Sequence, residues 1–292
     1  MVPLRVAAVA VLVLLTACTD PADPNSPGTS VTSGSPSTDT TPAAPSSGGG
    51  TPSASTALPV YYVVETAAGP RLYREFHAVP TADPPSDAVR EMLAATTGND
   101  PDYRSYWPSG TTLHAPVRYA DGVITVDLSG QARSAQVGSE LAELTVQQLV
   151  YTVQGALQST DPVRILIDGE PVPELWGHVS TGQPVVRADP YATRSLVQID
   201  NPGHGTTVGR TFTVSGEAAA FEANVPWQVL RSDGTVVQSG NTTAAQGQRF
   251  SAFRFSLTLD PGEYVVRITE DDPSAGAGRP PFQDTKLVRI PG

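Results

Sequence analysis

Cys18 is the only cysteine among the 292 residues, and its thiol is the side chain best suited to covalent chemistry. It directly follows Leu15, Thr16 and Ala17, at the end of an apolar run over residues 6–15 that Arg5 precedes. The run is about half as long as a bilayer-spanning helix requires, which is typical of a signal peptide. The sequence therefore predicts an export leader over residues 1–17.

Leu15, Thr16 and Ala17 before Cys18 resemble the lipobox of bacterial lipoproteins. The resemblance implies that the Cys18 thiol is acylated and that cleavage makes Cys18 the mature N-terminus. Two or three acyl chains anchor a protein stably, whereas one chain binds only reversibly. We therefore expect a lipid anchor at the extracytoplasmic face of the bacterial cell membrane. An ordinary secretory signal and a signal anchor are the alternatives.

No spacing of histidine, serine or acidic residues predicts catalysis. The chain has no G-x-S-x-G motif, and its four histidines form no H-x-x-H pair, although a zinc site assembled in space stays open. They are His77, His114, His178 and His204. Carboxylate pairs for glycoside hydrolysis also stay open among 29 acidic residues. We expect no enzyme activity, no cofactor and no metal, with an exported hydrolase as the third hypothesis.

Two further clusters have alternative interpretations. Glu270, Asp271 and Asp272 could bind calcium, but they lack the alternating spacing of a calcium loop, which favours a solvated loop. Five aromatic residues could form a platform that binds carbohydrate: Tyr61, Tyr62, Tyr103, Tyr106 and Trp107. Alternatively, because side chains alternate between the two faces of a strand, half of them are residues of the hydrophobic core. The platform would make the protein a binder of cell-wall glycan (peptidoglycan), which is the second hypothesis.

Residues 19–57 are mostly Ser, Thr, Pro and Gly, without any aromatic residue, Lys or Arg. Such a segment buries too little surface to order itself, so we predict a disordered tether over residues 18–57, beginning with the lipidated cysteine. An α+β domain then follows over residues 58–181, a linker over 182–194 and an all-β sandwich over 195–292.

The first domain is predicted to have the order β-β-α-β-β-α-β with a mixed sheet. Strands are expected at residues 59–65, 72–79, 112–119, 123–128 and 163–167, because β-branched and aromatic residues predominate there. Apolar residues at helical spacing predict helices over 86–97, capped by Ser86, and over 139–159. Asp121 and Asp168 each precede a glycine, which predicts tight turns.

The second domain shows seven short strand patterns and no helix, which is typical of a small β-sandwich. Asp233 before Gly234 predicts another hairpin. Phe221 and Trp227 are expected in the packing between the sheets. Glu222, beside an apolar strand, is expected to pair with Arg254 or Arg267.

The first domain resembles the GerMN family, the sporulation and spore germination domain, at residues 58–62, 107–111, 121–129, 148–153 and 163–171. The second resembles the immunoglobulin-like domain of bacterial spore germination, at residues 201–202, 208, 213–216 and 220–225. These resemblances imply an extracytoplasmic, non-enzymatic protein, and they transfer no functional residue.

The net charge of −11 argues against nucleic acid as a partner, since no basic patch exists to neutralise phosphates. Lys286 is the only lysine. The first hypothesis is therefore a lipid-anchored, non-catalytic envelope protein that presents two interaction domains on a flexible tether. Its expected partners are the membrane, through the lipid on Cys18, and an envelope protein of a sporulation or germination type of assembly.

Overall fold

The computed structural model describes residues 55–272, 274 and 277–292. Cys18, the lipobox residues and nearly all of the predicted tether lie outside this range. The first described element is a long hairpin of β1 (Ser55–Thr66) and β2 (Gly69–Pro80). It begins three residues before residue 58, where the first domain was predicted to start. Gly69 adopts φ 99°, which the turn between the two strands requires. The β-branched and aromatic residues of β1 account for its extended form.

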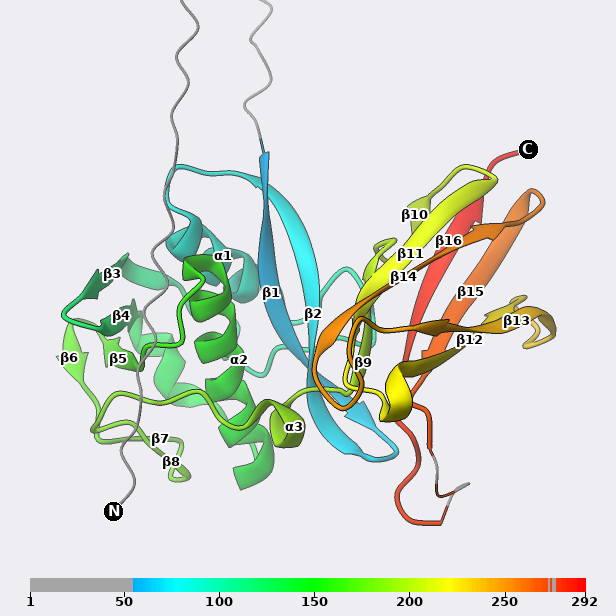
Figure 1. Cartoon of the computed structure of the whole chain (residues 1–292). Coiled ribbons are helices and arrows are strands. Elements are labelled where there is room, and N and C mark those ends of the chain that lie inside the picture. The colour runs from blue at the N-terminus through cyan, green and yellow to red at the C-terminus, as the bar shows by residue number, and fades with distance from the viewer. Residues whose placement is uncertain (1–54, 273, 275–276) are drawn as a thin grey trace, which may run out of the picture. The chain divides into compact units, whose positions relative to one another are not determined.

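Two helices pack against this hairpin (Figure 1). α1 (Pro84–Ala94) begins with two prolines, whose missing N–H groups cost nothing in a first turn. Its N-cap is Asp83, which accepts a hydrogen bond from the Ser86 N–H, so the prediction of Ser86 as the cap was wrong. The Ser86 hydroxyl instead accepts from the Val117 N–H at 2.8 Å. α2 (Ser139–Leu157) has Gln158 as its C-cap, and the backbone of Gln158 adopts the left-handed conformation.

A four-stranded sheet has the order β3-β4-β5-β6. Its strands are β3 (Leu113–Ala120), β4 (Val123–Leu128), β5 (Val163–Ile167) and β6 (Glu170–Pro171). Asp121 and Gly122, both at positive φ, form the predicted turn between β3 and β4. Parallel strands need a long crossover, and α2 supplies it between β4 and β5. The predicted element order and mixed sheet are confirmed.

The helices share one apolar core with the hairpin and the sheet. Val60 and Tyr62 from β1, Met92 from α1 and Val126 from β4 are all buried in it. Smaller elements follow β6: β7 (Glu174–Leu175), β8 (Val179–Ser180) and α3 (Pro190–Thr193), while a 3-10 turn, η1 (Gly130–Ser134), precedes α2. The segment predicted as a linker packs on the first domain, since Val185 pairs with Val163.

The second domain is a β-sandwich, as predicted. One sheet has the order β14-β11-β9, and the other has the order β10-β16-β15-β12-β13. The strands are β9 (Val197–Asn201), β10 (Thr206–Thr207), β11 (Thr211–Ala218), β12 (Asn224–Leu230), β13 (Val236–Thr243), β14 (Ser251–Thr258), β15 (Gly262–Thr269) and β16 (Gln283–Ile290); a 3-10 turn, η2 (Phe221–Ala223), precedes β12. Val214, Phe253, Val266 and Val288 lie in the core between the sheets.

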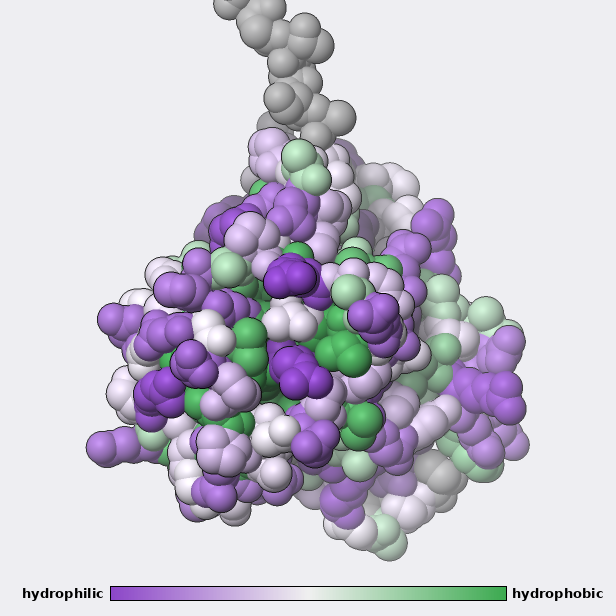
Figure 2. Space-filling model, turned by 90° about the vertical axis from the view of Figure 1, so that its left-hand side faces the viewer, coloured by the Kyte–Doolittle hydropathy of each residue, from purple (hydrophilic) through white to green (hydrophobic). Residues whose placement is uncertain are grey.

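The face of the molecule drawn in Figure 2 is predominantly hydrophilic. Figure 2 shows one face of the molecule, on which hydrophobic side chains appear mainly in recesses between hydrophilic ones. Within the described residues, we find no helix long and apolar enough to cross a membrane.

Candidate functional site at the domain junction

The structure does not form the aromatic platform that the sequence left open as an alternative to core packing. Tyr61, Tyr62, Tyr103 and Trp107 are each at most 5% exposed, so their faces are not available to a sugar ring. Trp107 packs edge-on against Trp176, with ring centroids 5.1 Å apart. The half-buried Tyr106 donates a hydrogen bond to Glu65. The platform fails because these aromatic rings fill the core, as strand alternation also allowed.

Among the described residues, no three or more His, Cys, Asp or Glu side chains form a group that could hold a metal ion. His77 lies on β2 between two carboxylates, with Nδ1 2.9 Å from Glu91 and Nε2 3.2 Å from Glu75. Burial lowers the pKa of His77, but hydrogen bonds and charges from both carboxylates outweigh burial and raise it overall. His204 places Nδ1 3.2 Å from Asp100.

The predicted ion pair of Glu222 was wrong. Glu222 lies exposed in η2 with φ 51°, and it forms no hydrogen bond or ion pair among the described residues. Arg267 instead donates to Gln228. Phe221 is 40% exposed, contrary to its expected packing, whereas Trp227 stacks on Phe255 with centroids 5.0 Å apart.

In the acidic cluster, the Glu270 carboxylate is already engaged. Both of its oxygens accept hydrogen bonds from Arg279, at 2.7 and 2.8 Å, and one also accepts from the Phe282 N–H. Asp271 accepts from the Asn224 amide at 3.0 Å. Glu270 and Asp271 therefore already have hydrogen-bond partners within the chain.

A cluster of buried charged and polar side chains surrounds Lys286, which joins the two domains. Lys286 lies on β16 and is 2% exposed. Its ammonium group donates to Asp100 at 2.8 Å, to the Tyr103 hydroxyl at 2.7 Å and to Asp284 at 3.2 Å. Asp100 and Tyr103 belong to the first domain, whereas Asp284 and Lys286 belong to the second. All three ammonium donors are therefore used, two of them across the junction.

Two buried carboxylates share this single ammonium. Burial lowers the pKa of Lys286, but the charges of Asp284 and Asp100 outweigh burial and raise it overall, so the lysine stays charged. Burial raises the pKa of Asp284, only partly offset by Lys286. Further hydrogen bonds hold this carboxylate, from the Ile199 N–H at 2.7 Å and the Thr285 N–H at 2.8 Å. Each member is thus fixed by several partners.

A second ionic cluster crosses the junction nearby. Arg74 on β2 contacts Asp200 on β9 at 2.7 Å and Glu217 on β11 at 3.4 Å. Arg194, between the domains, contacts Glu217 at 2.6 Å. Burial raises the pKa of Glu217, but the charges of Arg74 and Arg194 lower it overall. A hydrogen bond from the Tyr73 hydroxyl to the Gln283 carbonyl, 2.8 Å long, adds a neutral link.

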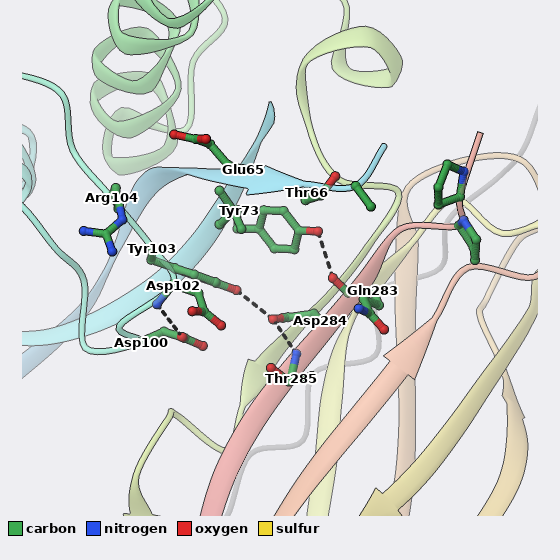
Figure 3. A pocket seen from close by; sticks show the side chains of 14 residues that line it. Glu65, Thr66, Tyr73, Asp100, Asp102, Tyr103, Arg104, Gln283, Asp284 and Thr285 are labelled. Carbon is green, nitrogen blue, oxygen red and sulfur yellow. Dashed lines mark hydrogen bonds between the residues drawn. The ribbon is translucent and has the colours of Figure 1, made fainter. Parts of the chain in front are cut away.

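A cavity of about 600 Å³ opens beside the Lys286 cluster. Figure 3 shows Asp102 and Arg104 on a loop of the first domain and Gln283 and Thr285 on β16 of the second. Four of the lining residues are buried at the bottom of the cavity: Tyr73, Tyr103, Asp100 and Asp284. Four others are exposed: Glu65, Asp102, Arg104 and Gln283. The cavity therefore has walls from both domains.

The carboxylates in this cavity bear on the hydrolase hypothesis. Asp100 and Asp284 are both held by Lys286 and by backbone N–H groups, which assigns them a structural role. Glu65 accepts a hydrogen bond from the Tyr106 hydroxyl. The buried acids thus serve the junction, and the contacts supply no argument for a general acid.

This cluster is not among the sites predicted from the sequence, although the sequence carries a signal for it. In β16, Asp284 and Lys286 occupy the same alternating positions as the buried Val288 and Ile290. Charged residues at core positions of a strand are normally paired, because an unpaired buried charge is costly. The chain's single lysine at such a position was the signal for a buried ion pair. Its partner, Asp100, could not be inferred, because 186 residues separate them.

Two family models match this chain. The model described as sporulation and spore germination matches residues 59–173, and the model described as the immunoglobulin-like domain of bacterial spore germination matches residues 196–277. A search among curated proteins finds no match. Both matches agree with the resemblances that the sequence carries.

Solved structures give weaker likenesses. The tandem GerMN domains of the sporulation protein GerM from Bacillus subtilis are 19% identical, with 49% of this chain and 50% of that chain covered and a TM-score of 0.38. This chain thus spans half the length of the GerM chain it matches. A protein from Clostridium perfringens is 16% identical, with 46% and 89% covered and a TM-score of 0.33. The family models therefore carry the assignment: the chain contains a sporulation and spore germination domain followed by an immunoglobulin-like domain of bacterial spore germination.

Proposed function

We propose that the protein is a lipid-anchored, non-catalytic accessory protein of the bacterial cell envelope. It presents its two domains to an envelope protein as one unit, at the end of a tether that starts at Cys18. The domain families support an envelope role of the sporulation or germination type. The lipobox sequence over residues 15–18 supports the anchor.

The observation that carries the non-catalytic part of this proposal is the bonding of Lys286. A buried lysine beside two carboxylates and a tyrosine is the kind of cluster that enzymes use for proton transfer. Here all three ammonium donors bond within the junction, to Asp100, Tyr103 and Asp284. The cluster therefore fixes one domain on the other, which suits a protein that acts through its surface.

The anchor is tested by fractionation of cells that express the full chain. We expect wild type in the membrane fraction, and we expect Cys18→Ala, or wild type treated with globomycin, to be released or mislocalised. Thr19→Ala is the matched control, because it alters the neighbouring residue and leaves residues 15–18 intact. Unchanged membrane fractionation of Cys18→Ala would overturn the anchor.

A further inference from the structure

The cavity at the domain junction is lined by two charged side chains that have no ion pair among the described residues. The Arg104 guanidinium and the Asp102 carboxylate form no hydrogen bond or ion pair with any described residue, nor with each other, although they are two positions apart. Both are exposed and both line the cavity (Figure 3). The buried charges beneath them are, in contrast, fully engaged. One residue of each charge, neither of them in an ion pair among the described residues, therefore lines the same cavity.

The remaining lining is suited to an organic ligand. Apolar walls come from Val64, Ala67, Pro280 and Pro281, and hydrogen-bonding groups come from Gln283 and Thr285. Ligand sites typically occupy cavities of roughly 300–1,000 Å³ at domain interfaces and combine apolar walls with a few polar groups. The cavity of about 600 Å³ meets this description. It is large enough for a molecule of two or three amino-acid residues.

We propose that this cavity binds a short peptide with a free ammonium group and a free carboxylate. Arg104 receives the ligand carboxylate, because a guanidinium can bond both oxygens of a carboxylate. Asp102 receives the ligand ammonium, with the exposed Glu65 adding negative charge at the rim. Gln283 and Thr285 hydrogen bond the peptide backbone from the second domain. Recognition of both termini limits the ligand to a short peptide.

The charge balance of the cavity supports a ligand with both charges. Its lining carries four carboxylates against the single guanidinium of Arg104, and Lys286 offsets two of these carboxylates from below. An anion alone would pair with Arg104 but would leave Asp102 and Glu65 without a counter-charge. A cation alone would leave Arg104 unpaired. A dipolar ligand satisfies both.

Isothermal titration calorimetry on the full chain in detergent tests this proposal. The probes are tri-L-alanine, tri-D-alanine and a tri-L-alanine blocked at both ends by acetyl and amide groups. We expect an unblocked peptide to bind and the blocked one not to bind. Tighter binding of the L-form would indicate peptides from proteins, and tighter binding of the D-form would indicate peptides of the cell wall.

Arg104→Ala is expected to weaken binding by about tenfold or more, because it removes a charge-assisted bidentate contact. Arg118→Ala, an exposed arginine on β3 outside the cavity, is the matched control and should bind like wild type. Asp102→Asn is a second variant, should Arg104→Ala fail to fold. The proposal is overturned if neither free peptide binds, if the blocked peptide binds equally well, or if the folded variants bind like wild type.

Discussion

Lys286 shows how one residue can decide the relation between two domains. Removing a charged group from water costs several kcal/mol, and only close partners offset that cost. Asp100 and Asp284 supply the charges, and the Tyr103 hydroxyl supplies a further acceptor. The stability of the junction therefore depends on the whole cluster, since the loss of one side chain leaves buried partners without the contact that offsets their burial.

Lys286→Met should lower the free energy of unfolding by about 3–5 kcal/mol, because it leaves two buried carboxylates without their counter-charge. Urea denaturation measures this change. The matched control is Arg289→Gln on the same strand, whose ion pair with Glu263 is exposed. That variant should lose less than about 1 kcal/mol. Equal stability of Lys286→Met and wild type would contradict the role given to this residue.

His77 predicts a dependence of stability on pH. Its folded pKa is raised above the usual value of 6.5, so it holds its proton more tightly in the folded state. A raised pKa stabilises the fold below the unfolded value, and that stabilisation is lost as pH rises through the folded value. The difference in unfolding free energy between wild type and His77→Gln should therefore be larger at about pH 5.5 than at about pH 9.

The control for this measurement is His114→Gln, which changes an exposed histidine on β3. Its difference from wild type should vary little between the two pH values. A His77→Gln difference that stays constant, or that grows with pH, would show that Glu75 and Glu91 do not hold a protonated His77 in the fold.

At the scale of single elements, hydrophobic pattern and turn residues were sufficient to predict most of the structure. Asp-Gly pairs marked the hairpin turns at Asp121, Asp168 and Asp233, and helical spacing identified α2. The start of α1 was misplaced, because Asp83 and Ser86 compete as caps and the tertiary contact of Ser86 with Val117 decides between them.

Close packing between β9 and β11 gives a test at this scale. A Cβ atom on Gly216 would lie 2.0 Å from the Gln198 carbonyl oxygen and 2.9 Å from the Phe253 ring. Because the nearest atom belongs to backbone, Gly216→Ala should destabilise the sandwich by at least about 1–3 kcal/mol. Thermal denaturation followed by circular dichroism measures this loss.

Gly209→Ala is the matched control, since its added Cβ would meet only the Thr211 carbonyl oxygen at 3.7 Å, an ordinary contact. It should leave the melting temperature nearly unchanged. If both variants keep the melting temperature of wild type, β9 and β11 do not approach each other at Gly216 closely enough to exclude a Cβ atom.

At the scale of the whole molecule, the sequence predicted two domains but not their connection. Each domain could be identified from local patterns, because strand and helix periods repeat within a few residues. The junction depends on pairs that are distant in the chain, such as Arg74 with Asp200 and Lys286 with Asp100. No local pattern specifies such pairs. The candidate cavity was missed for the same reason, since each domain contributes only part of its wall.

Buried charges of both domains pair at the junction, and we predict that these pairs make the two domains one cooperative unit. Differential scanning calorimetry of the full chain in detergent tests it most directly. We predict a single transition whose calorimetric and van't Hoff enthalpies agree, the signature of two-state unfolding. Lys286→Met should shift that transition to lower temperature or divide it. Two separate transitions in wild type, with neither affected by Lys286→Met, would contradict the account.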